Sequence, residues 1–461
     1  MTVAPNSLQA RDIAYTVHPY TNLRAHEQQG PLVITGGEGV WVKDDDGKRY
    51  IEGLAGLWCT GLGFSEPRLV EAARRQMARL PYSHSFAHRS HEPMIELAER
   101  LAAIAPPPIT RAYFCNSGSE AIDTAIKLIW YYQNARGLPA KKKIIARQRA
   151  YHGITLAAGH ITASLAYTSS GFDLPMADRF RFVTAPSHYR YGLEGESEDA
   201  FTDRLAAELE ALIEAEGADT VAAFFAEPVQ GAGGVIVPPQ SYFAKIQPIL
   251  KRHDILLVAD EVICGFGRTG SMWGSTTFAV RPDLVTIAKQ LSSAYLPIAG
   301  LLMSDAFYQV LADRSAELGT LGMGYTYAGH PVAAAVAVET LKIYESDRIV
   351  EHVQEVAPRF LARLQEMGQH PLVGEARGIG LIGAVEIVKD KASREQFETA
   401  LKVNAQIVAH CQAHGLLVRP LPGDVIGICP PLIITEEEVD LLFDRLQAGL
   451  DDALSTMRLA A

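Results

Sequence analysis

Two acids and an amine stand at the ends of three apolar runs of this sequence. AAFFAEP contains Glu227, ILLVAD ends at Asp260, and LVTIAK ends at Lys289. An ammonium beside a buried strand costs free energy unless it is paired, solvated or chemically converted. A lysine that forms a Schiff base with a carbonyl cofactor removes this cost, and an aspartate on a pyridinium nitrogen completes the electron sink of pyridoxal phosphate. Each residue alone is typical of a cap or a surface position, but together they predict such a cofactor site.

A small polar turn, FCNSGSEA, offers a cradle for the phosphate of this cofactor. Asn116, Ser117, Gly118 and Ser119 stand directly before an amphipathic stretch. A helix N-terminus presents free N–H groups and a positive dipole end to an anion. The alternative is an ordinary helix start in which Ser117 and Glu120 form a capping box. The strand-end lysine and aspartate favour the phosphate site.

Two other patterns indicate different chemistry but lack the context that it needs. GFGRTG, residues 265–270, fits the G-x-G-x-x-G fingerprint of dinucleotide binding, yet no helical pattern opens behind it and no acid stands about 20 residues on. His84, His88 and His91 have the spacing of one helix face, but their surroundings are loop-like and no Cys or acid cluster completes a metal site. We therefore expect neither NAD nor a metal.

The composition narrows the class of protein. The chain has 461 residues, 48% hydrophobic and 21% charged, which by length suits roughly two or three domains. A net charge of -11 argues against nucleic acid or an anionic membrane as partner, and no apolar stretch approaches the ~18 residues of a membrane span. The five cysteines lack disulfide or zinc spacing. With no signal-peptide pattern at the N-terminus, the sequence predicts a cytoplasmic protein.

Apolar β-like runs such as KKKIIAR, TVAAFFAEP, DILLVADE and DLVTIAK alternate with amphipathic stretches such as EDAFTDRLAAELEALIEAEG and QSYFAKIQPILKRH. Strands that are apolar throughout and alternate with helices predict a parallel sheet covered on both faces, which is an α/β architecture. GVWVKDDDGKRYIEG predicts a hairpin, and HPVAAAVAVETLKIYE predicts a long helix. We expect a large domain at 61–335 and a smaller α/β domain built from 1–60 and 336–461.

The sequence resembles the class III aminotransferases, which are pyridoxal-phosphate-dependent enzymes of fold type I. The resemblance covers most of the chain and is carried by GVWVKDDDGKRYIEG, FCNSGSEAIDTAIKL, YHG, EPVQGAGG, LLVADEVICGFGRTG, TIAKQLS and TYAGHP. It implies a large domain with a mainly parallel sheet and a smaller domain from both chain ends. It also implies a homodimer, alone or as a dimer of dimers, with active sites shared between subunits.

The resemblance assigns roles to individual residues. Lys289 would hold the cofactor as a Schiff base, Asp260 would pair with the pyridine nitrogen, and Glu227 would support Asp260. Tyr151 of YHG would stack on one face of the ring and Val262 on the other. The other residues implied to bind the cofactor are Ser117, Gly118, Ser119 and His152, with Thr326 of TYAGHP reaching the phosphate from the neighbouring subunit.

The class of amine is indicated by a missing glutamate. In related ornithine and 4-aminobutyrate enzymes, the EP-hydrophobic-QG motif continues with a glutamate that neutralises an arginine just before an APPL-like segment. Here these positions are Ala232 and Gly427. Arg419 of LLVRP stands where amine:pyruvate, or omega, aminotransferases carry a mobile arginine. The aromatic residues expected to line the amine pocket are Tyr20, Trp58, Phe86 and Tyr151.

These residues predict an omega-aminotransferase with ping-pong kinetics. The donor would be an omega-amine, diamine, polyamine or arylalkylamine, and the acceptor would be pyruvate or a similar oxo acid. An aminomutase or a decarboxylase would use the same lysine and aspartate, and alanine as coproduct distinguishes the aminotransferase from both. A third alternative is a cofactor-binding regulator, but such proteins usually append a DNA-binding module, and the chain shows none.

Overall fold

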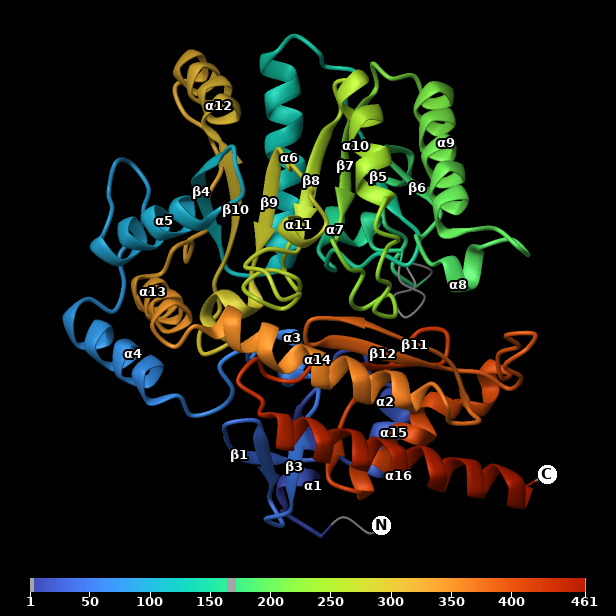
Figure 1. Cartoon of the computed structure of the whole chain (residues 1–461). Helices are drawn as coiled ribbons and strands as arrows, with labels where there is room; N and C mark the ends of the chain where they lie inside the picture. The colour runs from blue at the N-terminus through green and yellow to red at the C-terminus, as the bar shows by residue number, and fades with distance from the viewer. Residues whose placement is uncertain (1–3, 164–170, 461) are drawn as a thin grey trace.

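The computed structural model describes residues 4–163 and 171–460, and its central element is a seven-stranded sheet (Figure 1). The strand order is β4-β10-β9-β8-β7-β5-β6. All neighbours from β9 to β6 pair in parallel, whereas β10 runs against both β9 and β4. The strands are β4 (Ile109–Cys115), β5 (Lys143–Arg147), β6 (Phe180–Val183), β7 (Val221–Ala226), β8 (Leu256–Asp260), β9 (Leu284–Ile287) and β10 (Ala299–Ser304). The predicted mainly parallel sheet is confirmed.

Helices cover both faces of this sheet. Ile144 packs in a cluster with residues of α6, α7 and α12, whereas its neighbour Ile145 packs with residues of α9 and α10. Successive side chains of a strand point to opposite faces, so burial on both faces requires strands that are apolar throughout. The helices of this part are α4 (Pro67–Arg79), α5 (Glu92–Ile104), α6 (Gly118–Ala135), α7 (Leu156–Ile161), η2 (Ala177–Arg179), α8 (His188–Tyr191), α9 (Glu198–Glu216), α10 (Tyr242–Arg252), α11 (Gly274–Thr277), η3 (Lys289–Ser292), α12 (Asp305–Leu318) and α13 (Pro331–Ser346).

The ends of the long helices follow from the sequence. At the start of α9, Ser197 Oγ accepts a hydrogen bond from the backbone N–H of Ala200 at 3.2 Å, which satisfies one of the free donors of the first turn. Gly217 ends the helix with a φ of +82°, in the left-handed region that glycine adopts without strain. Ser197 and Gly217, which flank the amphipathic stretch at 198–216, therefore set the two ends of the helix.

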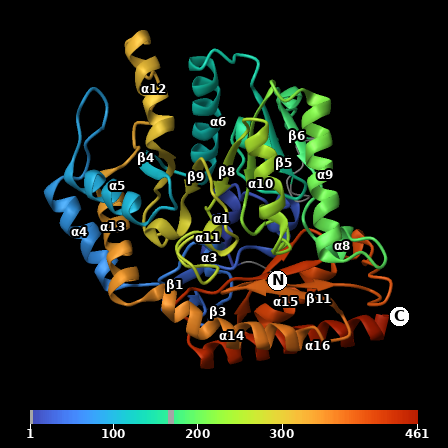
Figure 2. The ribbon, with the colours of Figure 1, turned by 45° about the horizontal axis from the view of Figure 1, so that its top comes forward.

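The two ends of the chain form a second structural unit. Figures 1 and 2 show the blue N-terminal strands beside the orange and red C-terminal helices. Strand β3 pairs with β2 in the predicted hairpin and in parallel with β13. One sheet has the order β1-β2-β3-β13 and another the order β11-β12-β15-β14. The elements are α1 (Leu8–Tyr15), α2 (Leu23–Gln29), β1 (Ile34–Glu38), β2 (Trp41–Asp44), β3 (Arg49–Glu52), α3 (Ala55–Trp58), α14 (Ile349–Met367), β11 (Val373–Ile379), β12 (Ile382–Ile387), η4 (Thr399–Leu401), α15 (Val403–Ala413), β13 (Leu416–Leu417), β14 (Arg419–Leu421), β15 (Val425–Ile428) and α16 (Glu436–Ala460).

The connection between the two units is helical. Residue 335 lies within α13, so the division into 1–60, 61–335 and 336–461 stays a prediction.

In the described part of the chain, no helix is both long and apolar enough to span a bilayer.

Candidate active site

Eight of the predicted residues line one cavity at the carboxyl edge of the parallel strands, among them Glu227, Asp260 and Lys289. Glu227 directly follows β7, Asp260 ends β8, and Lys289 lies two residues beyond β9. The carboxyl ends of parallel strands meet at one edge, where open α/β sheets bind ligands. The other residues that line the cavity are Gly118, Ser119, Tyr151, His152, Gly153, Val262, Ile263 and Ala288.

Lys289 is an amine without a carboxylate partner. It begins η3 with a φ of +50°, and its Nζ lies 5.4 Å from the centre of the Trp58 ring. Within the described residues, no carboxylate oxygen lies within 4.0 Å of Nζ. Removal from water lowers the pKa of Lys289 below its ordinary value, because a low dielectric disfavours the charged form. The free amine, which is the nucleophilic form, is thereby favoured.

Asp260 is held by three donors. Its Oδ2 lies 2.7 Å from Nδ1 of His152, and its Oδ1 accepts hydrogen bonds at 3.1 Å from the N–H of Val262 and from the hydroxyl of Thr286. Asp260 and His152 are both buried. These contacts fix the orientation of the carboxylate in the cavity. They also give His152 a definite position, which the YHG motif alone does not show.

Glu227 acts on the backbone rather than on Asp260. Its Oε1 accepts the N–H of Tyr151 at 3.0 Å and its Oε2 accepts the N–H of Gly231 at 2.9 Å. Burial raises the pKa of Glu227 above its ordinary value, and the charge of nearby Asp260 adds to the effect. In the structure, the direct partner of Asp260 is His152, while Glu227 fixes the backbone that carries Tyr151.

The polar turn before α6 serves both as a cap and as a cavity wall. Ser117 Oγ accepts the N–H of Glu120 at 3.2 Å, and Glu120 Oε2 accepts the N–H of Asn116 at 2.7 Å. The Ser117 side chain is therefore used as the helix cap. Gly118 and Ser119, the first two residues of α6, line the cavity. The N-terminus of a helix stabilises an anion.

The residues present fit pyridoxal phosphate. The cavity contains an unpaired amine for an aldehyde, an oriented carboxylate for a ring nitrogen, and the start of α6 for a phosphate. A Cβ at Gly118 would lie 3.2 Å from Cγ1 of Val262, and one at Gly153 would clash with Ser119. A side chain at either glycine would therefore crowd Val262 or Ser119, which also line the cavity.

Two cations, Lys289 and Arg419, lie against one indole ring, that of Trp58. Arg419 Cζ lies 5.3 Å from the centre of the Trp58 ring, against which Lys289 Nζ also lies. Burial lowers the pKa of Arg419, while the nearby hydroxyls of Tyr151 and Tyr20 counteract this. Arg419 faces Gly427 directly across the antiparallel pair β14–β15. Arg419 is thus a neighbour of Gly427, the position at which the related enzymes were expected to carry an arginine.

Seven predicted residues are not among those that line this cavity: Tyr20, Trp58, Phe86, Ser117, Ala232, Thr326 and Arg419. Phe86 packs beside Gly324, since a Cβ added there would lie 2.6 Å from the Phe86 ring. Thr326 lies in the same segment, and its carbonyl accepts a hydrogen bond from the Tyr82 hydroxyl at 2.8 Å. Ala232, in the turn after β7, is partly buried against the core beside α9 and α10.

The structure gives other roles to the patterns that resembled nucleotide and metal sites. Arg268 of GFGRTG is buried and donates to the carbonyls of Leu381 and Pro430, so this loop binds the C-terminal unit. His91 caps α5 by accepting the N–H of Met94. His84 accepts the N–H of Phe86.

Sequence reasoning missed several cavity residues and one partly buried acid. Gly153, Ile263 and Ala288 line the cavity, and each stands next to a residue of a recognised motif, which was the available signal. Glu52 ends β3 and its Oε1 accepts the N–H of Leu54 at 3.1 Å. It thereby anchors the loop that leads to Trp58.

Glu52 predicts a pH-dependent stability. Burial raises its pKa to about 7. A carboxyl whose folded-state pKa is raised contributes stability below its unfolded pKa and loses it as pH rises through the folded value. The free energy of unfolding of Glu52→Gln should therefore rise relative to that of wild type between about pH 5 and about pH 8, by at most about 3 kcal/mol. Thermal unfolding at several pH values measures this, and a constant difference would contradict it.

The fold and the cavity define a pyridoxal-phosphate-dependent enzyme. The family model for class III aminotransferases matches residues 23–450, and the chain belongs to this family. Gamma aminobutyrate transaminase 1, mitochondrial, from Solanum lycopersicum is 49% identical over 413 residues, which is 89% of this chain and 80% of that protein. As in the rest of the family, the cofactor is pyridoxal phosphate, and the reaction moves an amino group from an amine to an oxo acid.

Solved structures agree with this assignment. An omega transaminase from Pseudomonas jessenii, in complex with pyridoxamine phosphate (PMP), is 50% identical with a TM-score of 0.95 and covers 97% of this chain and 98% of its own. A transaminase solved with L-alanine is 51% identical with a TM-score of 0.90 and covers 92% of this chain and all of its own. The predicted family, fold class and cofactor are confirmed.

Proposed function

We propose that this aminotransferase takes amines that lack an α-carboxylate as donors and pyruvate as acceptor. The observation that carries the proposal is Arg419, which lies against Trp58 with no carboxylate within 4.0 Å in the described part of the chain. A buried guanidinium without a partner is costly, and an acceptor carboxylate supplies that partner. The transaminase with L-alanine, the product of pyruvate amination, supports this acceptor.

Each of these residues has a separate role in the reaction. When bound, the cofactor supplies an aldehyde for the amine and a ring that takes up electron density. Lys289 Nζ accepts and returns the proton of the substrate carbon, as base and then acid. Asp260, oriented by His152, would keep the ring nitrogen of the cofactor protonated. Tyr151, fixed through its backbone by Glu227, and Val262 would hold the ring.

A second candidate donor is 4-aminobutyrate. The tomato relative is named for it, and Arg419 can bind a donor carboxylate in the same way as an acceptor carboxylate. Against it stand Ala232 and Gly427, because no glutamate is present at these positions to neutralise the arginine. Initial rates with diamines, arylalkylamines and 4-aminobutyrate, each against pyruvate and 2-oxoglutarate, distinguish the two. Alanine formation also excludes an aminomutase or a decarboxylase.

We propose a homodimer in which Thr326 and Phe86 complete the neighbouring active site. Both lie away from the cavity of their own chain, in segments that contact each other through Gly324 and Tyr82. A groove beside them is lined by apolar side chains, among them Met94 and Met323, and Phe86 is 45% exposed. A partner would cover this surface. Light scattering of the purified protein measures the mass and distinguishes a dimer from a dimer of dimers.

We propose the cytoplasm as the compartment. All five cysteines are unpaired, which suits reducing surroundings. The plant relatives are named as mitochondrial or chloroplastic proteins, so fractionation of the source cells is the deciding measurement.

Arg419→Ala should separate the two half-reactions. A guanidinium grips a carboxylate through two parallel, charge-assisted hydrogen bonds. Its loss should therefore weaken the half-reaction with pyruvate by roughly 2 to 5 kcal/mol. The half-reaction with a carboxylate-free amine should change little. Stopped-flow absorbance measures the two half-reactions separately.

Arg49→Ala is the matched control for this variant. Arg49 also lies over an indole ring, that of Trp41 at 4.9 Å, but it is exposed and outside the cavity. Neither half-reaction should change in the control. Equal losses in both half-reactions of Arg419→Ala, or no loss with pyruvate, would assign the carboxylate to another residue.

A further inference from the structure

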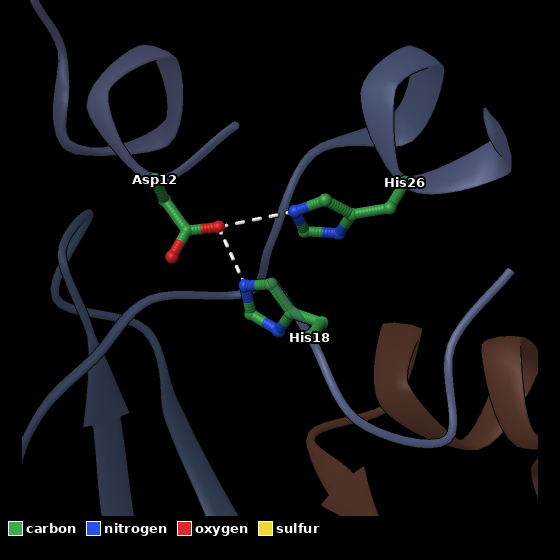
Figure 3. Close-up of side chains that lie close together, drawn as sticks. All are labelled: Asp12, His18 and His26. Carbon is green, nitrogen blue, oxygen red and sulfur yellow. Dashed lines mark hydrogen bonds and ion pairs between the residues drawn. The ribbon is translucent and has the colours of Figure 1, made fainter. Parts of the chain in front are cut away.

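Three metal-ligating side chains meet in the N-terminal segment, outside the active site. Asp12 comes from α1, His18 from the loop that follows, and His26 from α2 (Figure 3). Asp12 Oδ2 lies 2.7 Å from Nε2 of His18 and 3.0 Å from Nε2 of His26. The three ligand atoms all lie within 4.8 Å of one another. Two imidazoles therefore direct the same kind of atom at one carboxylate oxygen.

This geometry is close to that of a coordination sphere. Ligand atoms at ~2.0–2.1 Å from a tetrahedral ion lie about 3.3 Å apart. The observed O–N distances of 2.7 and 3.0 Å need to widen by only a few tenths of an ångström. The two imidazole rings already lie side by side, with centroids 4.2 Å apart.

The ligands are held by elements with their own caps. Ser7 Oγ accepts the N–H of Ala10 at the start of α1, and Asn22 Oδ1 accepts the N–H of Ala25 at the start of α2. The side chains are partly buried, with exposures of 23% for Asp12, 30% for His18 and 10% for His26. They are thus preorganised but reachable by an ion.

The chemistry of the three side chains suits a divalent ion. Carboxylate oxygen and imidazole nitrogen both bind such ions, and metal binding releases the proton that either group carries.

We propose that Asp12, His18 and His26 bind one divalent ion of the zinc type. Imidazole favours zinc and its first-row neighbours, whereas an all-oxygen shell would suit magnesium or calcium. Three protein ligands leave a position for water. The ion ties α1 and the following loop to α2.

The ion would also act on the loop that carries Tyr20. Tyr20 lies in the loop between His18 and α2, and its hydroxyl influences the pKa of Arg419. An ion bound by His18 before this loop and by His26 after it restricts the motion of the loop. The bound ion therefore stiffens the segment that brings Tyr20 to the substrate arginine.

The test uses untagged holoenzyme, because a purification tag of histidines would bind the ion. Zn²⁺ is titrated calorimetrically into wild type, Asp12→Asn, His26→Ala and the control His414→Gln, and bound zinc is counted after dialysis. His414 is a suitable control because it also pairs with an aspartate, its Nε2 lying 2.8 Å from Asp452 Oδ2. His410 Nδ1 is 3.9 Å from the same oxygen, and these three residues do not form a metal-ligand group.

The expected result is one Zn²⁺ per chain in wild type and in the control. Asp12→Asn and His26→Ala should each weaken binding by at least about 10-fold, because even a lost outer-shell partner costs 10–100-fold. Zn²⁺ should also slow hydrogen exchange in residues 8–29 of the wild type and not in these variants. Asp12→Asn keeps an acceptor oxygen, so its cofactor absorbance should stay that of the folded enzyme. No binding by wild type, or equal binding by both site variants, overturns the proposal.

Discussion

Lys289→Ala is expected to lower amino transfer by more than about 10⁴-fold, because one residue supplies both the covalent attachment and the proton transfer. Proton transfer by a positioned group alone contributes roughly 10² to 10⁴-fold. No other lysine lines the cavity in the described part of the chain, so no neighbour can replace it. The contacts at the start of α6 remain, and the variant should still retain some cofactor. Steady-state rates and the cofactor absorbance measure the two effects.

Chemical labelling tests the same assignment without a rate. Borohydride reduction of the wild-type holoenzyme should fix the cofactor to the peptide that contains Lys289, as mass spectrometry of a digest can show. Lys251→Ala is the control, since Lys251 is exposed near the end of α10, and its activity should equal that of wild type. Label on Lys251 or Lys127 instead would reject Lys289 as the attachment point.

Asp260→Asn should slow the half-reaction with amine by roughly 10² to 10⁴-fold. Removing one partner of a buried charge pair costs roughly 3 to 5 kcal/mol, which corresponds to that factor in rate. The neutral amide cannot hold the ring-nitrogen proton by Coulomb attraction in a poorly solvated cavity. It also changes the contact with His152 Nδ1, now 2.7 Å from the carboxylate. Single-turnover absorbance of the half-reaction measures the loss.

Asp283→Asn is the control for this variant. Asp283 stands at the other end of β9 and accepts the N–H of Leu257 at 2.8 Å, so it tests damage to the sheet without touching the cavity. Its half-reaction rate should stay near that of wild type. A near-normal rate in Asp260→Asn, with cofactor bound, would remove Asp260 from the proposed role.

The sequence by itself determined the layers of the fold and the line of chemistry along one sheet edge. Strands buried on both faces must be apolar throughout, and helices between them must be amphipathic, so the pattern around β7, β8 and β9 was readable. Once these strands are parallel, Glu227, Asp260 and Lys289 must lie at the same edge. The cap of Ser117 on α6 was readable as well, because a cap depends on a few consecutive residues.

The tertiary structure alone decided which side chains touch. His152 reaches Asp260 across 108 positions of the chain, and no periodicity encodes such a distance. Arg419 of β14 lies against Trp58 of α3, although the two elements come from opposite ends of the chain. Asp12, His18 and His26 converge only because the loop between α1 and α2 brings the three side chains together. Long-range contacts of this kind depend on packing and loop geometry, which local residue preferences do not specify.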